Sequence, residues 1–232
     1  MLVIQKLQKD LRTFIKENYS SLIWKNVYNL FWDITSCLRV LHNDNLVHRD
    51  LHPGNILQGP AGKWYTADFG LCGPANESSS SVYGNLAYMA PEVIRGAQYT
   101  PAADVYSIGM LMYHVVTGRP PFETRNRDYS LAFDICDGIR PQIVENIPDK
   151  YQELMKRCWD ADTANRPNAL QLRDYFLSEC RKSAQSSDYG TKLVNQSSIF
   201  PSYETEHIEQ SKVYEFNNLP IPRNATLGKN IV

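Results

Sequence analysis

Cysteine is scarce and dispersed in this sequence. The cysteines number five, none belongs to a Cys-x-x-Cys pair, and they are Cys37, Cys72, Cys136, Cys158 and Cys180. A structural zinc site or a disulfide framework needs clustered or paired cysteines, so this spacing argues against both. We therefore expect free thiols in a reducing compartment, and a cytoplasmic location.

Strong net charge and long apolar runs are also missing. The formal net charge is −1, which gives no concentrated basic surface to attract nucleic acid or an anionic membrane. The most apolar run, Val105 to Val116, is only about 12 residues long, whereas a membrane-spanning helix needs ~20. We expect no nucleic-acid partner and no membrane partner, and we interpret this run as a buried helix.

The remaining composition is that of a globular domain followed by a polar tail. Hydrophobic residues make up 43% of the chain and charged residues 21%, which is enough apolar content for a packed core. From about residue 181 to Val232 the sequence shifts to Ser, Asn, Gln and isolated aromatics without a period. We expect one domain over residues 1–180 and a disordered or loosely docked tail over residues 181–232.

One polar stretch has the residues for phosphoryl transfer. His48 to Leu57 has the sequence His-Arg-Asp-Leu-His-Pro-Gly-Asn-Ile-Leu, with Asp50 and Asn55 five residues apart. A loop can aim this pair, a proton acceptor and an oxygen ligand for Mg²⁺, into one small volume, as phosphoryl transfer requires. A further carboxylate follows in the Asp-Phe-Gly motif at Asp68. Taken singly, each Asp is better explained as a loop or capping residue, and it is the ordered set that indicates phosphoryl transfer.

The order and spacing of these motifs, closed by Ala-Pro-Glu at Glu92, resemble the protein kinase family. Cys-Trp at Trp159 and Arg-Pro at Arg166 are similar to its tyrosine-kinase-like group, of Ser/Thr type. The resemblance implies a mainly α fold: a protein-kinase-like C-terminal lobe, formed by a helical bundle with a small β-hairpin, plus a remnant hinge strand. It also implies ATP and Mg²⁺ as cofactors, a protein substrate and a place in signal transduction.

The resemblance assigns four catalytic residues. Asp50 would orient the attacking hydroxyl or accept its proton, while Asn55 and Asp68 would hold Mg²⁺. His52 departs from the family pattern, since many Ser/Thr kinases have Lys there to neutralise the γ-phosphate. A histidine supplies a full positive charge only when it is protonated. Activity is then either weakened, or His52 donates a hydrogen bond as a neutral imidazole.

The nucleotide base would lie between the chain start and the catalytic loop. By the same resemblance, Gln5 to Leu7 form the hinge that binds adenine, Ile4 is the gatekeeper, and Leu57 is the floor of the adenine pocket. A short apolar run such as this start, Met-Leu-Val-Ile-Gln-Lys-Leu, is more often a plain strand. Both interpretations stay open here.

Several residues around the loop have regulatory or bracing interpretations. We expect His48 to brace the loop by packing and hydrogen bonding. Arg49 is either a solvated charge or the guanidinium that receives an activation-segment phosphate. The serines at 78–81 and Tyr83 form either a flexible linker or that phosphorylated segment. Asn85 stands where many Ser/Thr kinases have Thr.

The rest of the sequence is interpreted as scaffold. Asp104 would either accept hydrogen bonds from the catalytic-loop backbone or act as a helix N-terminal carboxylate, and Arg166 would pair with Glu92. Apolar spacing and turn residues predict the elements. They are helices at Asp10 to Glu17, Leu22 to Asn43, Tyr129 to Cys136, Lys150 to Trp159 and Ala169 to Glu179, and a hairpin at Gly54 to Leu57 and Lys63 to Ala67.

The resemblance covers about residues 1–180 and only the large lobe of the family. We find no Gly-rich loop and no strand Lys to cover and neutralise the phosphates, so we expect no measurable ATP binding by these residues alone. The main hypothesis is a Ser/Thr protein kinase domain lacking its N-terminal lobe. A pseudokinase-like protein-binding module is the alternative, and a different phosphotransferase class is disfavoured by Ala-Pro-Glu and Asp104.

Overall fold

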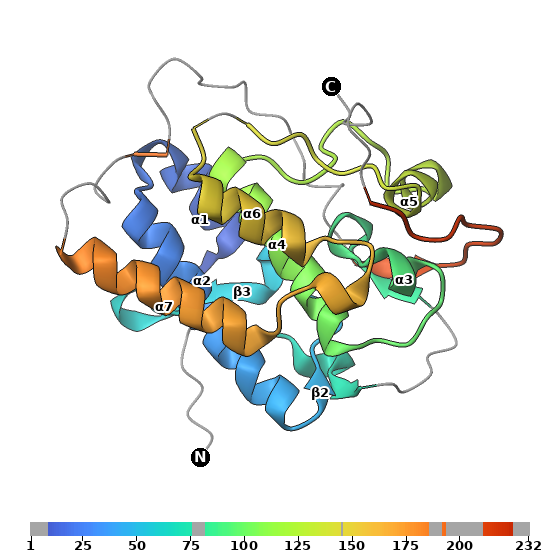
Figure 1. Ribbon diagram of the computed structural model, residues 1–232, viewed down its shortest axis with the longest axis horizontal. Helices are drawn as coiled ribbons and strands as arrows, with labels where there is room; N and C mark the ends of the chain where they lie inside the picture. Colours follow the sequence, from blue (N-terminus) through green and yellow to red (C-terminus); the bar gives the residue numbers. More distant parts are fainter. Residues whose placement is uncertain (1–8, 76–81, 145, 186–191, 194–210, 225–232) are drawn as a thin grey trace.

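Helices form most of the structure, and the strands between them are short (Figure 1). The computed structural model describes residues 9–75, 82–144, 146–185, 192–193 and 211–224. The predicted gatekeeper, the hinge and the serines at 78–81 lie outside these residues. Among the described helices, none is long and apolar enough to cross a membrane. The predicted kinase-like, mainly helical fold is confirmed.

The central helix is α4, which spans Pro101–Thr117. Its side chains are buried on nearly every face, from Ala103 through Met112, because other elements cover it all round. The run interpreted as a buried helix is therefore confirmed. On one side α4 approaches α6 (Asp149–Cys158) so closely that a Cβ on Gly109 would lie 2.8 Å from the Cβ of Cys158.

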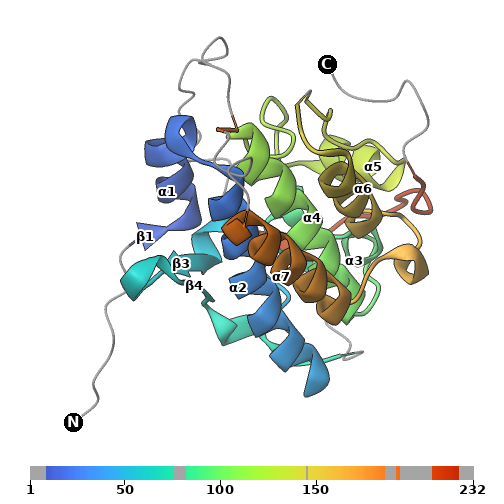
Figure 2. The same cartoon turned by 60° about the vertical axis from the view of Figure 1, so that its left-hand side comes forward.

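Two long helices, α2 (Trp24–Asn43) and α7 (Ala169–Gln185), lie side by side (Figures 1 and 2). The rings of Phe31 and Phe176 stack between them at 5.3 Å. The buried positions of α2 follow the three and four spacing that predicted the helix. They are Trp24, Val27, Tyr28, Leu30, Phe31, Ile34, Thr35 and Leu38.

The first helix, α1, spans Leu11–Asn18, and the Asp10 carboxylate caps it by accepting from the Thr13 N–H at 2.7 Å. The predicted hairpin forms β3 (Ile56–Gln58) and β4 (Trp64–Thr66). Sequence reasoning missed its third strand, β1 (Lys9–Asp10), which pairs antiparallel with β3. The remaining early strands, β2 (Leu46–Val47) and β5 (Gly73–Pro74), form a separate antiparallel pair.

The later elements frame the segment after the Asp-Phe-Gly motif. Strand β6 (Val82–Gly84) is followed by α3 (Pro91–Ile94), and α5 (Tyr129–Cys136) has the predicted bounds. Helix α7 continues to Gln185, so the expected domain boundary at residue 180 falls inside it. Within the expected tail, β7 (Lys212–Tyr214) pairs antiparallel with β6.

Candidate active site

The catalytic loop runs between β2 and β3, and its two central side chains are joined. Asn55 Nδ2 donates to the Asp50 backbone carbonyl at 2.9 Å and to Asp50 Oδ2 at 3.3 Å. Both residues are buried. Because the amide nitrogen of Asn55 is used inside the loop, its carbonyl oxygen Oδ1 is the atom suited to a cation. The structure thus brings the predicted proton acceptor and one predicted metal ligand together.

Asp104, in the first turn of α4, holds this loop in place. Its carboxylate accepts from the backbone N–H of His48 at 2.9 Å and from that of Arg49 at 3.0 Å, and His42 Nε2 lies 2.9 Å from Oδ2. Asp104 is only 2% exposed, and a buried carboxylate is tolerated only when it has polar partners such as these three. The prediction that Asp104 accepts from the catalytic-loop backbone is confirmed. Arg49 has φ 72, in the left-handed region. The Asp104 carboxylate accepts from the N–H of Arg49 itself and from that of the preceding residue, His48.

His48 braces the loop against the neighbouring Asp-Phe-Gly segment, as predicted. Its Nε2 lies 3.1 Å from the Ala67 carbonyl oxygen, and its ring lies 5.2 Å from that of Phe69. Burial lowers the pKa of His48, although the Asp104 charge opposes this effect. The imidazole is therefore neutral at physiological pH and supports the loop by packing and by its contact with the Ala67 carbonyl.

Asp68 follows β4 in a left-handed conformation, with φ 60 and ψ 72. Its Oδ1 accepts from the Gly70 N–H at 3.3 Å, and its side chain is exposed. The adjacent Ala67 N–H donates to the Asn55 carbonyl at 2.8 Å. A backbone hydrogen bond thus joins Asn55, one predicted metal ligand, to the residue just before Asp68, the other.

This donor set fits Mg²⁺ held together with phosphates better than a metal held by protein alone. Among the described residues, no group of three or more His, Cys, Asp or Glu is suited to a metal ion. Mg²⁺ usually keeps several waters and takes one or two carboxylates plus substrate phosphates. The Asp68 carboxylate and the Asn55 amide oxygen match that pattern.

His52 is a partner of Asp50 and also a backbone cap. Its Nε2 lies 3.6 Å from Asp50 Oδ2, and its Nδ1 accepts from the Gly54 N–H at 3.1 Å. The capping contact was not predicted, although His at this position of a tight turn can accept from the residue two further on. Burial would raise the pKa of Asp50, but His52, the Ser211 hydroxyl and His48 hold it below its usual value. The Asp50 carboxylate is therefore ionised at neutral pH.

Ser211 is the site residue that sequence reasoning missed. Its Oγ donates to the Asp50 carboxylate, at 2.9 Å from Oδ1 and 3.1 Å from Oδ2. The serine comes from the expected tail, 161 residues along the chain from Asp50. No motif or period marked it, because the contact arises only through the pairing of β7 with β6.

Polar contacts are made on both sides of residues 76–81 in the segment that leads from Asp68 to Glu92. Arg49 Nη2 donates to the Pro74 carbonyl at 2.8 Å, and its guanidinium lies over the Tyr99 ring at 5.6 Å. The phosphate-receiving role of Arg49 stays a prediction. Asn85 Oδ1 accepts from the Ala87 N–H at 3.3 Å, so it caps the turn before Met89.

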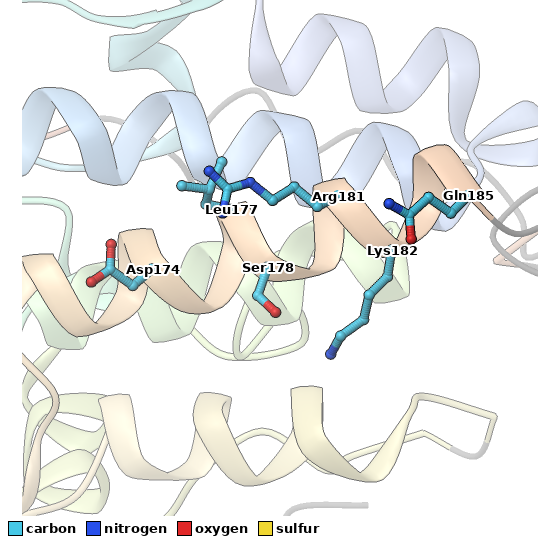
Figure 3. A pocket seen from close by; sticks show the side chains of 6 residues that line it. All are labelled: Asp174, Leu177, Ser178, Arg181, Lys182 and Gln185. Carbon is cyan, nitrogen blue, oxygen red and sulfur yellow. The ribbon is translucent and has the colours of Figure 1, made fainter.

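The other predicted binding residues are placed only in part. Gln5 and Leu7 lie outside the described residues, and Leu57 lies in β3 between Asp10 and Tyr65 of the flanking strands. Its predicted contact with adenine stays a prediction. Figure 3 shows a surface hollow lined entirely by α7, at Asp174, Leu177, Ser178, Arg181, Lys182 and Gln185. No catalytic-loop residue lines that hollow, so it is separate from this site.

Comparison with known proteins agrees with this geometry. The protein kinase domain family matches residues 1–176. A putative serine/threonine-protein kinase/receptor, R831 of Acanthamoeba polyphaga mimivirus, is 33% identical over 166 residues, which are 70% of this chain and 10% of the relative. Human serine/threonine-protein kinase Nek10 is 33% identical over 162 residues, 68% of this chain and 14% of Nek10.

This chain covers a larger share of a plant relative. Serine/threonine-protein kinase VIK of Arabidopsis thaliana is 34% identical over 186 residues, 74% of this chain and 42% of VIK. The chain thus spans less than half the length of the relatives it matches. Since the family match covers residues 1–176, which are most of the chain, this chain belongs to the protein kinase family.

Proposed function

We propose that this chain carries the catalytic loop of a protein kinase that transfers the γ-phosphoryl group of ATP to Ser or Thr hydroxyls of proteins. The observation that carries the proposal is the buried Asp50 carboxylate, bonded to Asn55 and contacted by a serine hydroxyl. A side-chain hydroxyl in that position is oriented for attack and has its proton acceptor beside it. The Ser/Thr kinase relatives support the same activity.

Each site residue has a defined task in this reaction. Asp50 orients the acceptor hydroxyl and receives its proton, and Asn55 keeps the Asp50 carboxylate in position through Nδ2. Asp68 and the Asn55 carbonyl oxygen are the ligands for Mg²⁺. When bound, Mg²⁺ supplies charge neutralisation on the phosphate oxygens.

The acceptor class follows from how near a peptide strand comes to Asp50. A strand paired with β6 places the hydroxyl of Ser211, which is attached directly to Cβ, in contact with the carboxylate. A tyrosine hydroxyl is separated from Cβ by a whole ring, so the same strand position would carry it past Asp50. The spacing therefore supports Ser or Thr as the acceptor.

The test is phosphate transfer by the full-length protein from γ-labelled ATP, in Mg²⁺, to myelin basic protein. We expect labelled phosphoserine and phosphothreonine, and a loss of turnover of about 10²- to 10⁴-fold in Asp50→Asn. Asp44→Asn, at an exposed Asp in the turn after α2, is the control and should retain turnover. A folded protein that transfers no phosphate would instead support the pseudokinase-like binding module.

A further inference from the structure

The C-terminal segment, residues 211–224, lies along the part of the molecule that a substrate peptide must reach. Its strand β7 pairs antiparallel with β6, with Val82 opposite Tyr214 and Gly84 opposite Lys212. In Figure 1 this red segment passes α3 and α5. In the sequence, strand β6 lies between the Asp-Phe-Gly motif and α3. By pairing with β6, the C-terminal segment lies beside the part of the chain that follows the Asp-Phe-Gly motif.

The register of this pairing brings one hydroxyl to the catalytic carboxylate. Ser211 precedes β7, and its Oγ contacts both oxygens of Asp50. Gly84, opposite Lys212, has φ 145, and a Cβ there would lie 3.0 Å from Met89 Cε and 3.5 Å from Asp50 Oδ1. The positive φ favours glycine at this position, where β6 lies close to Asp50.

The segment is seated by several contacts beyond the strand pair. Tyr214 is buried and its ring stacks on Phe216 at 5.3 Å, while Phe216 meets Tyr129 of α5 at 6.2 Å. Further on, the Arg223 N–H donates to the Cys136 carbonyl at 2.9 Å, and Asn224 Nδ2 donates to Asp160 Oδ1 at 3.0 Å. Apolar contacts of Tyr214 and Phe216 and hydrogen bonds of Arg223 and Asn224 thus add to the strand pairing that places Ser211 beside Asp50.

On the basis of the proposed function, we propose that Ser211 is an intramolecular phosphate acceptor and that residues 211–224 bind as a substrate of their own domain. The Ser211 Oγ forms a bond to the γ-phosphorus of ATP and passes its proton to the Asp50 carboxylate. The bond from that phosphorus to the β–γ bridging oxygen breaks, and its electron pair leaves with ADP. The hydroxyl, the proton acceptor and the peptide strand for this step are all present in one chain.

Transfer also changes the charge beside Asp50. Phosphoserine carries a charge of about −1.5 to −2 at pH 7, and the ionised Asp50 repels it at the distance of the present hydrogen bond. The modified segment therefore loses its contact with Asp50, and the site opens to other protein substrates. Ser211 phosphorylation is in this way both a reaction of the site and the release of its blockage.

The experiment follows phosphate on Ser211 by mass spectrometry in the full-length protein with Mg²⁺ and γ-labelled ATP. We expect labelling whose first-order rate is unchanged on dilution, and no label on tagged Asp50→Asn chains mixed with the active protein. Ser211→Ala should lose this label and Ser211→Thr should keep it at the same position. Ser20→Ala, at an exposed serine after α1, is the control and should be labelled on Ser211 like the parent.

Three outcomes would overturn the inference. Phosphorylation of myelin basic protein without label on Ser211 removes the inference and leaves the proposed function standing. Absence of label on both proteins removes both. Label on Ser211 that rises with concentration, or appears on the Asp50→Asn chains, shows transfer between molecules and contradicts the intramolecular contact.

Release of the segment has its own measurement, amide hydrogen exchange. In the unmodified protein, we expect β6 and β7 to be protected because they pair. After phosphorylation of Ser211, exchange over residues 212–214 should become faster. Unchanged protection in the phosphorylated protein would contradict the release of the segment.

Discussion

Arg166 and Glu92 form a two-pronged ion pair across 74 residues of sequence. Arg166 Nη1 lies 2.6 Å from Oε1 and Nη2 lies 2.8 Å from Oε2, and the Arg166 side chain is 0% exposed. The guanidinium also lies over the Tyr106 ring of α4 at 5.2 Å and donates to the Ala102 carbonyl. The pair thus ties α3, at the end of the activation segment, to the central helix and to the chain before α7, as the sequence predicted.

Glu92→Gln should lower the free energy of unfolding by about 3 kcal/mol, because the Arg166 guanidinium remains buried without its counter-charge. Urea unfolding followed by circular dichroism measures this. The matched control is Glu17→Gln, which removes the Lys9 partner of an exposed pair and should change stability by less than about 1 kcal/mol. If both variants lost the same free energy of unfolding, burial would not make the Arg166–Glu92 pair more important for stability than an exposed pair.

His114 should make the fold less stable in weak acid. Burial, with the charges of Arg12 and Arg127, lowers its pKa from 6.5 to about 3, and its Nδ1 lies 2.8 Å from the Tyr88 hydroxyl. Below pH 6.5 the unfolded chain therefore binds a proton that the folded chain does not, so stability falls as pH falls. Between pH 7 and pH 5 the parent should lose about 2 kcal/mol more than His114→Asn.

Urea titrations of both proteins at the two pH values give this difference directly. Burial also lowers the pKa of His48, but that histidine is present in both proteins and its contribution cancels. Parallel losses in parent and variant would show that His114 does not cause the acid sensitivity.

Gly109→Ala should destabilise the protein by about 1 to 3 kcal/mol, because the new Cβ would lie 2.8 Å from that of Cys158. Helix propensity alone predicts the opposite sign, a gain of up to ~1 kcal/mol. Asn29→Ala, at an exposed position of α2, reports propensity without the steric clash. A midpoint of thermal unfolding that rises in both variants would contradict the close approach of α4 and α6.

His52→Lys should leave turnover unlowered and reduce stability by about 1 kcal/mol, since lysine supplies charge near Asp50 but cannot accept from the Gly54 N–H. His52→Asn, which keeps an acceptor and lacks the charge, is the matched comparison. Steady-state kinetics and thermal unfolding separate the two effects. A large drop in the turnover of His52→Lys would assign a role to the imidazole itself.

Contacts between motifs were predictable, while contacts made by short irregular segments were not. The pairing of Arg166 with Glu92 and the anchoring of the loop by Asp104 followed from motifs whose spacing resembles a known family. Helix α2 followed from apolar periodicity, which is strong over long elements, and α5 was predicted as well. Their bounds were close, although α2 begins at Trp24 rather than Leu22, whose carbonyl instead accepts from the Leu193 N–H.

The third strand of the small sheet, the last turn of α7 and the placement of Ser211 were missed. Strands β1 and β7 have two and three residues, which is too short for an alternating pattern to be recognised. The polar composition after residue 180 also resembles that of a linker. Only the packing of Tyr214 and the pairing with β6, both distant in sequence, determine where that segment lies.

The pairing of β6 with β7 has a consequence for the behaviour of the protein in solution. In the part of the chain that the structure describes, β7 is the strand that pairs with β6. Unpaired strand edges recruit strands from other molecules, which leads to aggregation or to exchange of segments between copies. By pairing its own C-terminal residues with β6, the chain protects this edge from such association. Any event that releases the segment also leaves the edge of β6 unpaired and open to strands of other molecules.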